Sequence, residues 1–153
     1  MPITTSCGFA DGPGGKGNEV LILLGPTIAV DIGFDPTFDP TKPASPKPGL
    51  SGLKALIDTG ASISCIDSLL AAQLGLPISD RRFTSGAHGA KEVNFHLAQI
   101  HVPSLHHTIY GQFAAVDLIA GGQQHHALLG RTFLYQFQMT YDGMTGAVTL
   151  SRP

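Results

Sequence analysis

Apolar positions follow short, regular patterns along much of the chain. Residues 19–35, EVLILLGPTIAVDIGFD, hold two apolar runs separated by a Gly-Pro pair, which is typical of a turn. In the second run Ile28, Val30 and Ile32 occupy every second position, the period of a half-buried strand. We therefore predict two β-strands in this stretch.

One helix is predicted over residues 66–77, IDSLLAAQLGLP. Its leucines and alanines share one helical face, Asp67 or Ser68 can cap its start, and a Gly and a Pro end it. Residues 81–97, RRFTSGAHGAKEVNFHL, instead predict a β-hairpin with glycines at its tip. The remaining chain predicts short strands separated by turns. The sum is an all-β fold, a closed barrel or folded sheet with one short helix.

Two segments lack such patterns. Residues 1–18 include the stretch GPGGKG and are expected to form a flexible N-terminal segment, followed by a single domain over 19–153. Residues 36–52, PTFDPTKPASPKPGLSG, are too rich in proline for regular structure. They predict a long exposed loop, for which disorder is the favoured interpretation and a functional loop the alternative.

Composition limits the partners. Charged residues make up only 13% of the 153 residues, and the net charge is -2. Such a chain is expected to bury apolar surface against a partner, most simply a second copy of itself. A surface rich in uncharged Ser, Thr, Gly and His is the alternative. No basic stripe is present, so the sequence argues against nucleic-acid binding.

The cysteines and histidines predict no metal site, and we expect no cofactor. Cys7 and Cys65 lack the spacing of a disulfide framework or metal motif. Cys7 is expected in the mobile N-terminal segment, and Cys65 as a small buried residue. The seven histidines include two adjacent pairs, but neighbouring residues on a strand face opposite sides. Solvated loop histidines are therefore expected.

The given sequence shows no targeting pattern. Its N-terminus lacks the basic start and apolar segment of a signal peptide. No apolar run approaches the ~18 residues of a membrane-spanning helix. These features predict a cytoplasmic protein without a membrane partner.

The stretch ALIDTGAS, residues 55–62, carries the candidate chemistry. An acid at the end of an apolar run is costly unless it is hydrogen-bonded or has a task. Gly60 permits a sharp bend after Asp58, the Thr59 hydroxyl can lock the turn, and Ala61 keeps the space above the carboxylate open. A structural carboxylate that caps a turn is the alternative interpretation of Asp58.

A single Asp-Thr-Gly turn suggests that a second chain is needed. Two facing carboxylates cannot both ionise, so they share one proton and can act as a base and an acid together. The chain supplies only one such turn. A two-fold dimer would place Asp58 opposite its own copy.

Two stretches together resemble a known family. LIDTGAS is similar to the active-site motif of the retropepsin-like aspartic peptidases, which are half-size, homodimeric relatives of pepsin. ALLGRTFL, residues 127–134, resembles the second signature of that family, in which two apolar residues and a glycine pack beneath the catalytic loop. The predicted hairpin lies between the two, where the family has its flap. The predicted helix is more similar to bacterial than to viral members, and the resemblance spans roughly residues 25–150.

The resemblance implies roles for individual residues. Asp58 would be the catalytic carboxylate, Thr59 would hydrogen-bond across the dimer, and Gly60 would orient the carboxylate and contact the substrate backbone. Ala61 would complete the catalytic loop. The substrate-binding flap would consist of Gly86, Ala87, His88 and Gly89. The second signature would consist of Leu128, Leu129, Gly130 and Arg131.

The sequence also departs from the viral pattern. Ser62 and Ile63 stand where viral members carry acidic residues, so the partner of Arg131 is open. Two functions follow. The first is an aspartic endopeptidase that acts on extended peptides or unfolded protein segments. The second is a non-catalytic dimerisation or peptide-binding module on the same fold.

Overall fold

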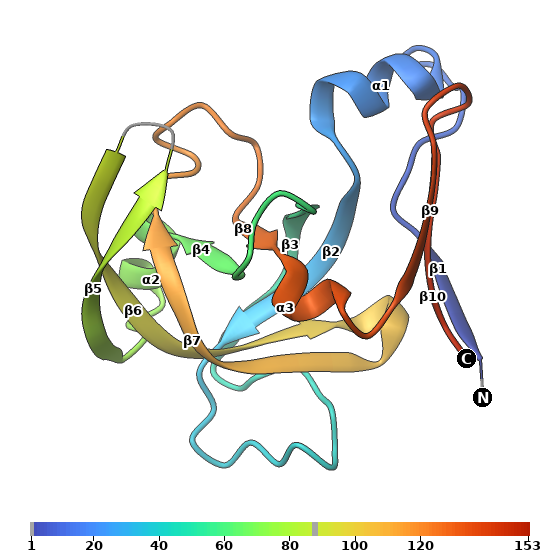
Figure 1. The fold of residues 1–153 in the computed structure, drawn as a ribbon. Helices are drawn as coiled ribbons and strands as arrows, with labels where there is room; N and C mark the ends of the chain where they lie inside the picture. The colour runs from blue at the N-terminus through green and yellow to red at the C-terminus, as the bar shows by residue number, and fades with distance from the viewer. Residues whose placement is uncertain (1, 87–88) are drawn as a thin grey trace.

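The computed structural model describes residues 2–86 and 89–153, and it is mostly β-structure (Figure 1). The strands are β1 (Ile3–Ser6), β2 (Thr27–Gly33), β3 (Gly49–Ile57), β4 (Cys65–Asp67), β5 (Ile78–Gly86), β6 (Gly89–Val102), β7 (His107–Val116), β8 (Ala127–Leu129), β9 (Gln138–Asp142) and β10 (Ala147–Arg152). The helices are α1 (Gly17–Leu24), α2 (Ser68–Gln73), α3 (Arg131–Leu134) and the 3₁₀ turn η1 (Pro103–Leu105).

Six strands close into a barrel. They follow the order β2-β3-β8-β4-β7-β6, and β2 pairs with β6 to complete the ring, while β5 pairs with β6 outside it. The main core includes the fully buried side chains of Val30, Ile32, Ile100, Leu129 and Phe133. The prediction of an all-β fold with a closed barrel is confirmed.

A parallel strand pair brings the ends of β3 and β8 together. β3 runs parallel to β8, with Ile57 beside Leu129, and β4 runs parallel to β7. β4 also pairs with β8, in the antiparallel sense. Parallel neighbours end at the same edge of a sheet. The residues that follow β3 and β8 therefore lie next to each other.

A separate three-stranded sheet, β1-β10-β9, lies beside the barrel (Figure 1). β1 pairs with β10 along its whole length, and the buried Cys7 donates its backbone N–H to Val148 O at 2.9 Å. The expectation of a flexible segment over 1–18 is thus wrong for the part that forms β1 and buries Cys7. Its partner strand lies at the other end of the sequence, where local patterns give no signal.

Helix α1 corrects a second prediction. The run at 19–24, expected as a strand, is helical and ends at Gly25, whose φ of 71° suits a helix end. Five consecutive apolar residues have no period, so periodicity could not separate strand from helix. With α2 and α3, the chain has more than the one helix that was expected. In α2, Asp67 caps the start by accepting the Leu70 N–H at 3.3 Å.

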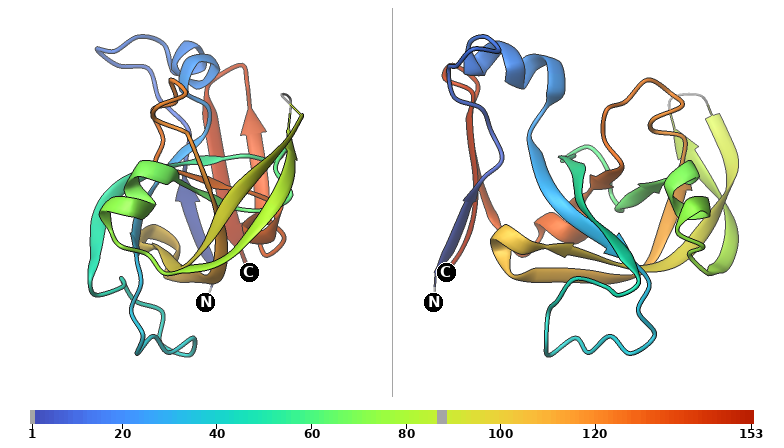
Figure 2. Two further views of the ribbon diagram at one scale, coloured as in Figure 1. Left: turned by 90° about the vertical axis from the view of Figure 1, so that its left-hand side faces the viewer. Right: turned by 180° about the vertical axis from the view of Figure 1, so that it is seen from behind.

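The proline-rich loop has local structure. It occupies residues 34–48, because 49–52, predicted as loop, begin β3. The buried Asp31 carboxylate accepts hydrogen bonds from the Ser45 hydroxyl and from Gly52 N–H, the latter at 3.1 Å. Short side-chain turns form at Asp35 and Asp39. The favoured interpretation of disorder therefore does not fit this loop, which extends from the end of the barrel opposite α1 (Figure 2).

Candidate active site

The Asp58 turn begins where β3 ends. Asp58 N–H donates to Leu129 O at 2.9 Å, which continues the pairing of β3 with β8 by one residue. One carboxylate oxygen, Oδ1, accepts the Gly60 N–H at 2.9 Å. The side chain is only half-buried. The turn therefore fixes one carboxylate oxygen and leaves the group open to a ligand or water.

The second signature lies directly beneath this turn. A Cβ atom on Gly130 would lie 2.4 Å from Ile63 O and 2.8 Å from Ala61 O, so no side chain fits there. Gly130 N–H donates to Ser64 Oγ at 3.1 Å, and Arg131 N–H donates to Ala61 O at 2.9 Å. The structure thus brings the two sequence motifs into direct backbone contact.

Arg131 has a different partner from the acidic side chain of viral members. Its guanidinium donates to the backbone carbonyl of Thr59 at 2.8 Å. A carbonyl can take the place of a carboxylate because the arginine needs only an acceptor. Leu129 is fully buried in the main core, while Leu128 packs beside Cys65 in a smaller apolar cluster. Leu129, Gly130 and Arg131 therefore contact the turn directly, whereas Leu128 does not.

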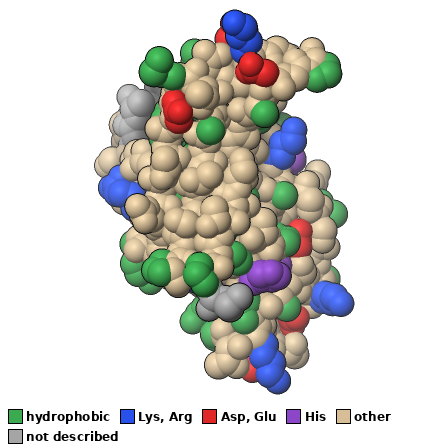
Figure 3. Space-filling model, turned by 90° about the vertical axis from the view of Figure 1, so that its right-hand side faces the viewer, with side chains coloured by type: hydrophobic (Ala, Val, Ile, Leu, Met, Phe, Trp, Pro, Cys, Tyr) green, Lys and Arg blue, Asp and Glu red, His purple; other side chains and the backbone are tan. Residues whose placement is uncertain are grey.

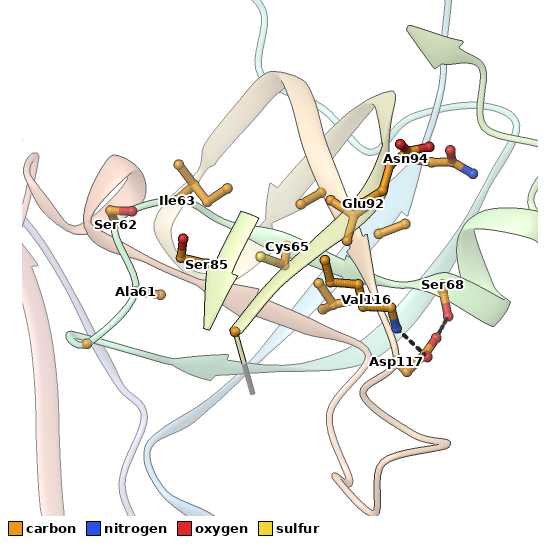
Figure 4. A pocket seen from close by; sticks show the side chains of 16 residues that line it. Ala61, Ser62, Ile63, Cys65, Ser68, Ser85, Glu92, Asn94, Val116 and Asp117 are labelled. Atoms are coloured by element: carbon orange, nitrogen blue, oxygen red, sulfur yellow. Dashed lines mark hydrogen bonds and ion pairs between the residues drawn. The ribbon is translucent and has the colours of Figure 1, made fainter. Parts of the chain in front are cut away.

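A cleft of about 860 Å³ opens beside the turn (Figure 4). Residues Gly60–Ile63 form one wall, and the β5–β6 hairpin forms another. Its apolar floor consists of Cys65, Val93, Ala114 and Val116. The volume and the mainly apolar lining suit an extended peptide with an apolar side chain. These floor residues were not identified from the sequence. Alternation along the predicted hairpin could have indicated Val93, because it places Val93 on the same face as Lys91, and both line the cleft.

Charged residues lie at the edge of the cleft. Lys91 Nζ on the hairpin is 3.5 Å from Asp117 Oδ2, and the Ser68 hydroxyl also donates to Asp117 (Figure 4). The Ser68 hydrogen bond and then the Lys91 charge lower the pKa of Asp117. The buried Asp67 holds the adjoining loop by accepting the N–H groups of Leu118 and Ile119, each at 3.0 Å. These contacts fix the outer end of the cleft.

Cys65 is not suited to act as a nucleophile. Burial, with a smaller contribution from the Asp58 charge, raises the pKa of its thiol to about 11. The thiolate is the reactive form, so little of it is present at neutral pH. Cys65 is buried, as expected from the sequence, and forms part of the cleft floor (Figure 4).

The hairpin extends further than predicted, over β5 and β6 instead of 81–97. Gly86 pairs with Gly89 at its end, and Gly89 has a φ of 91°, which suits a tight connection. Ser85 and Gly89 line the cleft. Ala87 and His88, which the sequence places at the tip, lie outside the described residues.

Several histidines are buried instead of solvated. His96 Nδ1 lies 2.8 Å from Leu76 O, His101 Nδ1 lies 2.8 Å from Thr108 Oγ1, and His125 Nε2 lies 2.8 Å from Thr27 Oγ1. Each ring has one partner from another segment, which local sequence could not reveal, while Nδ1 of His125 is buried without a partner. In residues 2–86 and 89–153, no three His, Cys, Asp or Glu side chains are grouped to hold a metal ion. Over the same residues, every helix is too short for a membrane span.

Comparison with known proteins identifies the family. No curated protein gives a significant match to the chain. The sequence profile of the family described as "gag-polyprotein putative aspartyl protease" matches residues 51–136, which is more than half of the chain. The matched region contains the Asp58 turn, the hairpin and the second signature. The chain therefore belongs to the retropepsin-like aspartic peptidase family.

Proposed function

We propose that the protein is an aspartic endopeptidase whose active site forms between two copies of the chain. The observation that carries this proposal is the Asp58 turn. One carboxylate is oriented by the Gly60 N–H, remains open on its other side, and stands beside a peptide-sized cleft. A structural turn cap would gain nothing from this open side. A second Asp58, from the other chain, supplies the missing acid.

The two carboxylates divide the chemistry. The ionised Asp58 takes a proton from a water molecule, whose oxygen attacks the carbonyl carbon of the scissile peptide bond. The protonated Asp58 of the other chain gives its proton to the carbonyl oxygen. In the second step the C–N bond breaks, the amine leaves with a proton from the first carboxyl group, and the second carboxylate takes one hydroxyl proton as the C=O bond forms again. Because the pair shares one proton, we expect maximal activity on the acid side of neutral.

The neighbouring residues position the acid and the substrate. Thr59 is exposed next to Asp58 and is proposed to hydrogen-bond across the dimer, with its own carbonyl held by Arg131. Gly60 orients the carboxylate and leaves its open side free for substrate backbone. The small side chain of Ala61 leaves the space beside the carboxylate open. Substrate is proposed to lie as an extended strand in the cleft, covered by the hairpin residues Gly86, Ala87, His88 and Gly89.

The proposal is tested by incubating the protein with an unfolded, casein-like substrate over a range of pH. Mass spectrometry then identifies the peptide bonds that are cut. We expect internal cleavage in the acid range and preference for apolar residues next to the cut, because the cleft floor is apolar. A verified dimer that binds the substrate but cuts it at no pH would support the non-catalytic module instead.

A further inference from the structure

Helix α1 presents two large apolar side chains to solvent. Ile22 is 78% exposed and Leu23 is 81% exposed, although the neighbouring Leu21 is buried. Glu19 is the only charged residue among the eight of the helix. Single exposed apolar residues are common, but two adjacent ones on a helix with so little charge suggest a surface that another molecule covers.

The helix is fixed to the body of the protein. A Cβ atom on Gly146, in the turn between β9 and β10, would lie 2.3 Å from the backbone carbon of Gly17, the first residue of α1. At the other end, Thr27 N–H, just after the helix, donates to Cys7 O at 2.8 Å. The β9–β10 turn also carries Met144, which is 87% exposed. The apolar residues are therefore presented at fixed positions.

This surface is at the same end of the molecule as the Asp58 turn. Immediately after α1, a Cβ atom on Gly25 would lie 2.7 Å from Leu56 Cδ1, two residues before Asp58. Ile57 N–H donates to Pro26 O at 2.9 Å. Figures 1 and 2 show α1, the β9–β10 turn and the end of the hairpin at one end of the molecule in every view.

We infer that the apolar surface of α1, formed by Ile22 and Leu23, is a contact between the two copies of the chain in the active dimer, with Met144 at its margin. The inference rests on the proposed function. If a second Asp58 faces the first, the second copy must lie against the end of the molecule that carries the Asp58 turn and α1. On the face that carries the three-stranded sheet, basic and acidic side chains are scattered, with no large block of one sign (Figure 3). Two copies brought together would therefore not oppose large blocks of like charge.

The contact is a feature of this chain and not of the matched family region, since α1 lies outside residues 51–136. In a two-fold dimer the same surface is contributed by both copies, so each substitution acts twice. A change that removes apolar area without weakening the helix should thus shift the dimer equilibrium strongly.

The test is sedimentation equilibrium of Ile22→Gln and Leu23→Gln, singly and together. Gln retains helix propensity. We expect the dimer dissociation constant to rise roughly tenfold or more for each variant, because two buried apolar side chains are lost per dimer. Leu69→Gln is the matched control, since Leu69 is 55% exposed on α2 at the other side of the barrel, and it should leave the constant unchanged (Figure 1). Thermal unfolding monitors the fold of each variant.

A second measurement does not depend on affinity. Leu23→Cys is spin-labelled, which is selective because Cys7 and Cys65 are buried, and is mixed with unlabelled ¹⁵N chain. We expect broadening of α1 amides in the ¹⁵N chain. Suppose that the wild type is a dimer, the Gln variants have unchanged dissociation constants and no broadening is seen. This result would overturn the inference about α1 but not the proposed function. A wild-type chain that sediments only as a monomer would overturn the proposed function and the inference with it.

Discussion

The Asp58 turn and the β5–β6 hairpin face the same cleft but are held in opposite ways. The turn is fixed by backbone hydrogen bonds at Asp58, Gly130 and Arg131, with almost no free volume beneath it. The outer hairpin packs Val93 into the small buried cluster with Cys65 and Ala114. Its other side-chain contacts with the barrel are exposed, in the Lys91–Asp117 ion pair and the Arg82–Gln112 hydrogen bond. Exposed ion pairs contribute about 0–1 kcal/mol. The fold thus holds the Asp58 turn firmly and the outer hairpin weakly.

The largest effect is expected at the fixed turn itself. Asp58→Asn keeps the shape and the hydrogen bond from Gly60 but cannot accept the proton of water. We predict a loss of peptide hydrolysis of about 10³-fold or more, with little change in melting temperature. Asp39→Asn, on the exposed loop, is the control and should retain activity. Near-normal activity of the Asp58 variant would rule out the aspartic mechanism.

Packing beneath the turn gives the next largest effect. Gly130→Ala would force a Cβ atom against the carbonyl oxygens of Ala61 and Ile63. We predict a loss of about 2–4 kcal/mol in the free energy of unfolding, measured with urea. Gly14→Ala is the matched control, because a Cβ atom there meets no atom within 4 Å. Equal stability of the two variants would show that the turn is less tightly packed than described.

A smaller effect concerns the pH dependence of stability and the buried His125, which lies near Lys54 of β3, the strand that leads to Asp58. Burial, and then the charges of Lys54 and His126, lower the pKa of His125. The unfolded chain binds a proton near pH 6.5, whereas folded His125 does so only at lower pH. Stability should therefore fall as pH decreases below about 6.5 and level off below the folded pKa. Urea titrations at several pH values measure the change of the free energy of unfolding with pH, and His125→Gln should make this change smaller. An unchanged pH dependence would show that other groups cause it.

The smallest effect on stability is expected at the hairpin. Lys91→Ala removes the ion pair with Asp117, and we predict a change below about 1 kcal/mol in the free energy of unfolding. Hydrogen exchange provides the sharper measurement. Amides of Asp58 and Arg131 should exchange slowly, and Ser85 and Lys91 should gain protection when a peptide inhibitor binds. If amides of the Asp58 turn and of the hairpin exchanged equally slowly without inhibitor, the two regions would not differ as described.

Local sequence was sufficient to predict an all-β fold, as a closed barrel or a folded sheet, and to single out the Asp58 turn. Small residues after an acid specify a tight turn, and alternation specifies half-buried strands, so neither needs knowledge of the rest of the chain. The pairing of Gly130 with this turn was predicted only through the family resemblance, because the two segments lie about 70 residues apart.

The missed features depend on distant partners. The sequence predicts a strand where α1 forms, because the apolar run has no period that would distinguish the two. The burial of Cys7 depends on β10 at the other end of the chain, and that of His125 on Thr27 across β3. The cleft floor joins residues of β4, β6 and β7, a juxtaposition that only the closed barrel creates.

The central claim is that each active site needs one Asp58 from each of two chains. Its most direct test is to mix equal amounts of wild type and Asp58→Asn, allow the subunits to exchange, and measure peptide hydrolysis per total protein. If mixed dimers are inactive, activity falls to about one quarter of that of wild type alone, because only dimers with two intact chains work. A value of one half would show that each chain acts with its own Asp58 alone and would contradict the account.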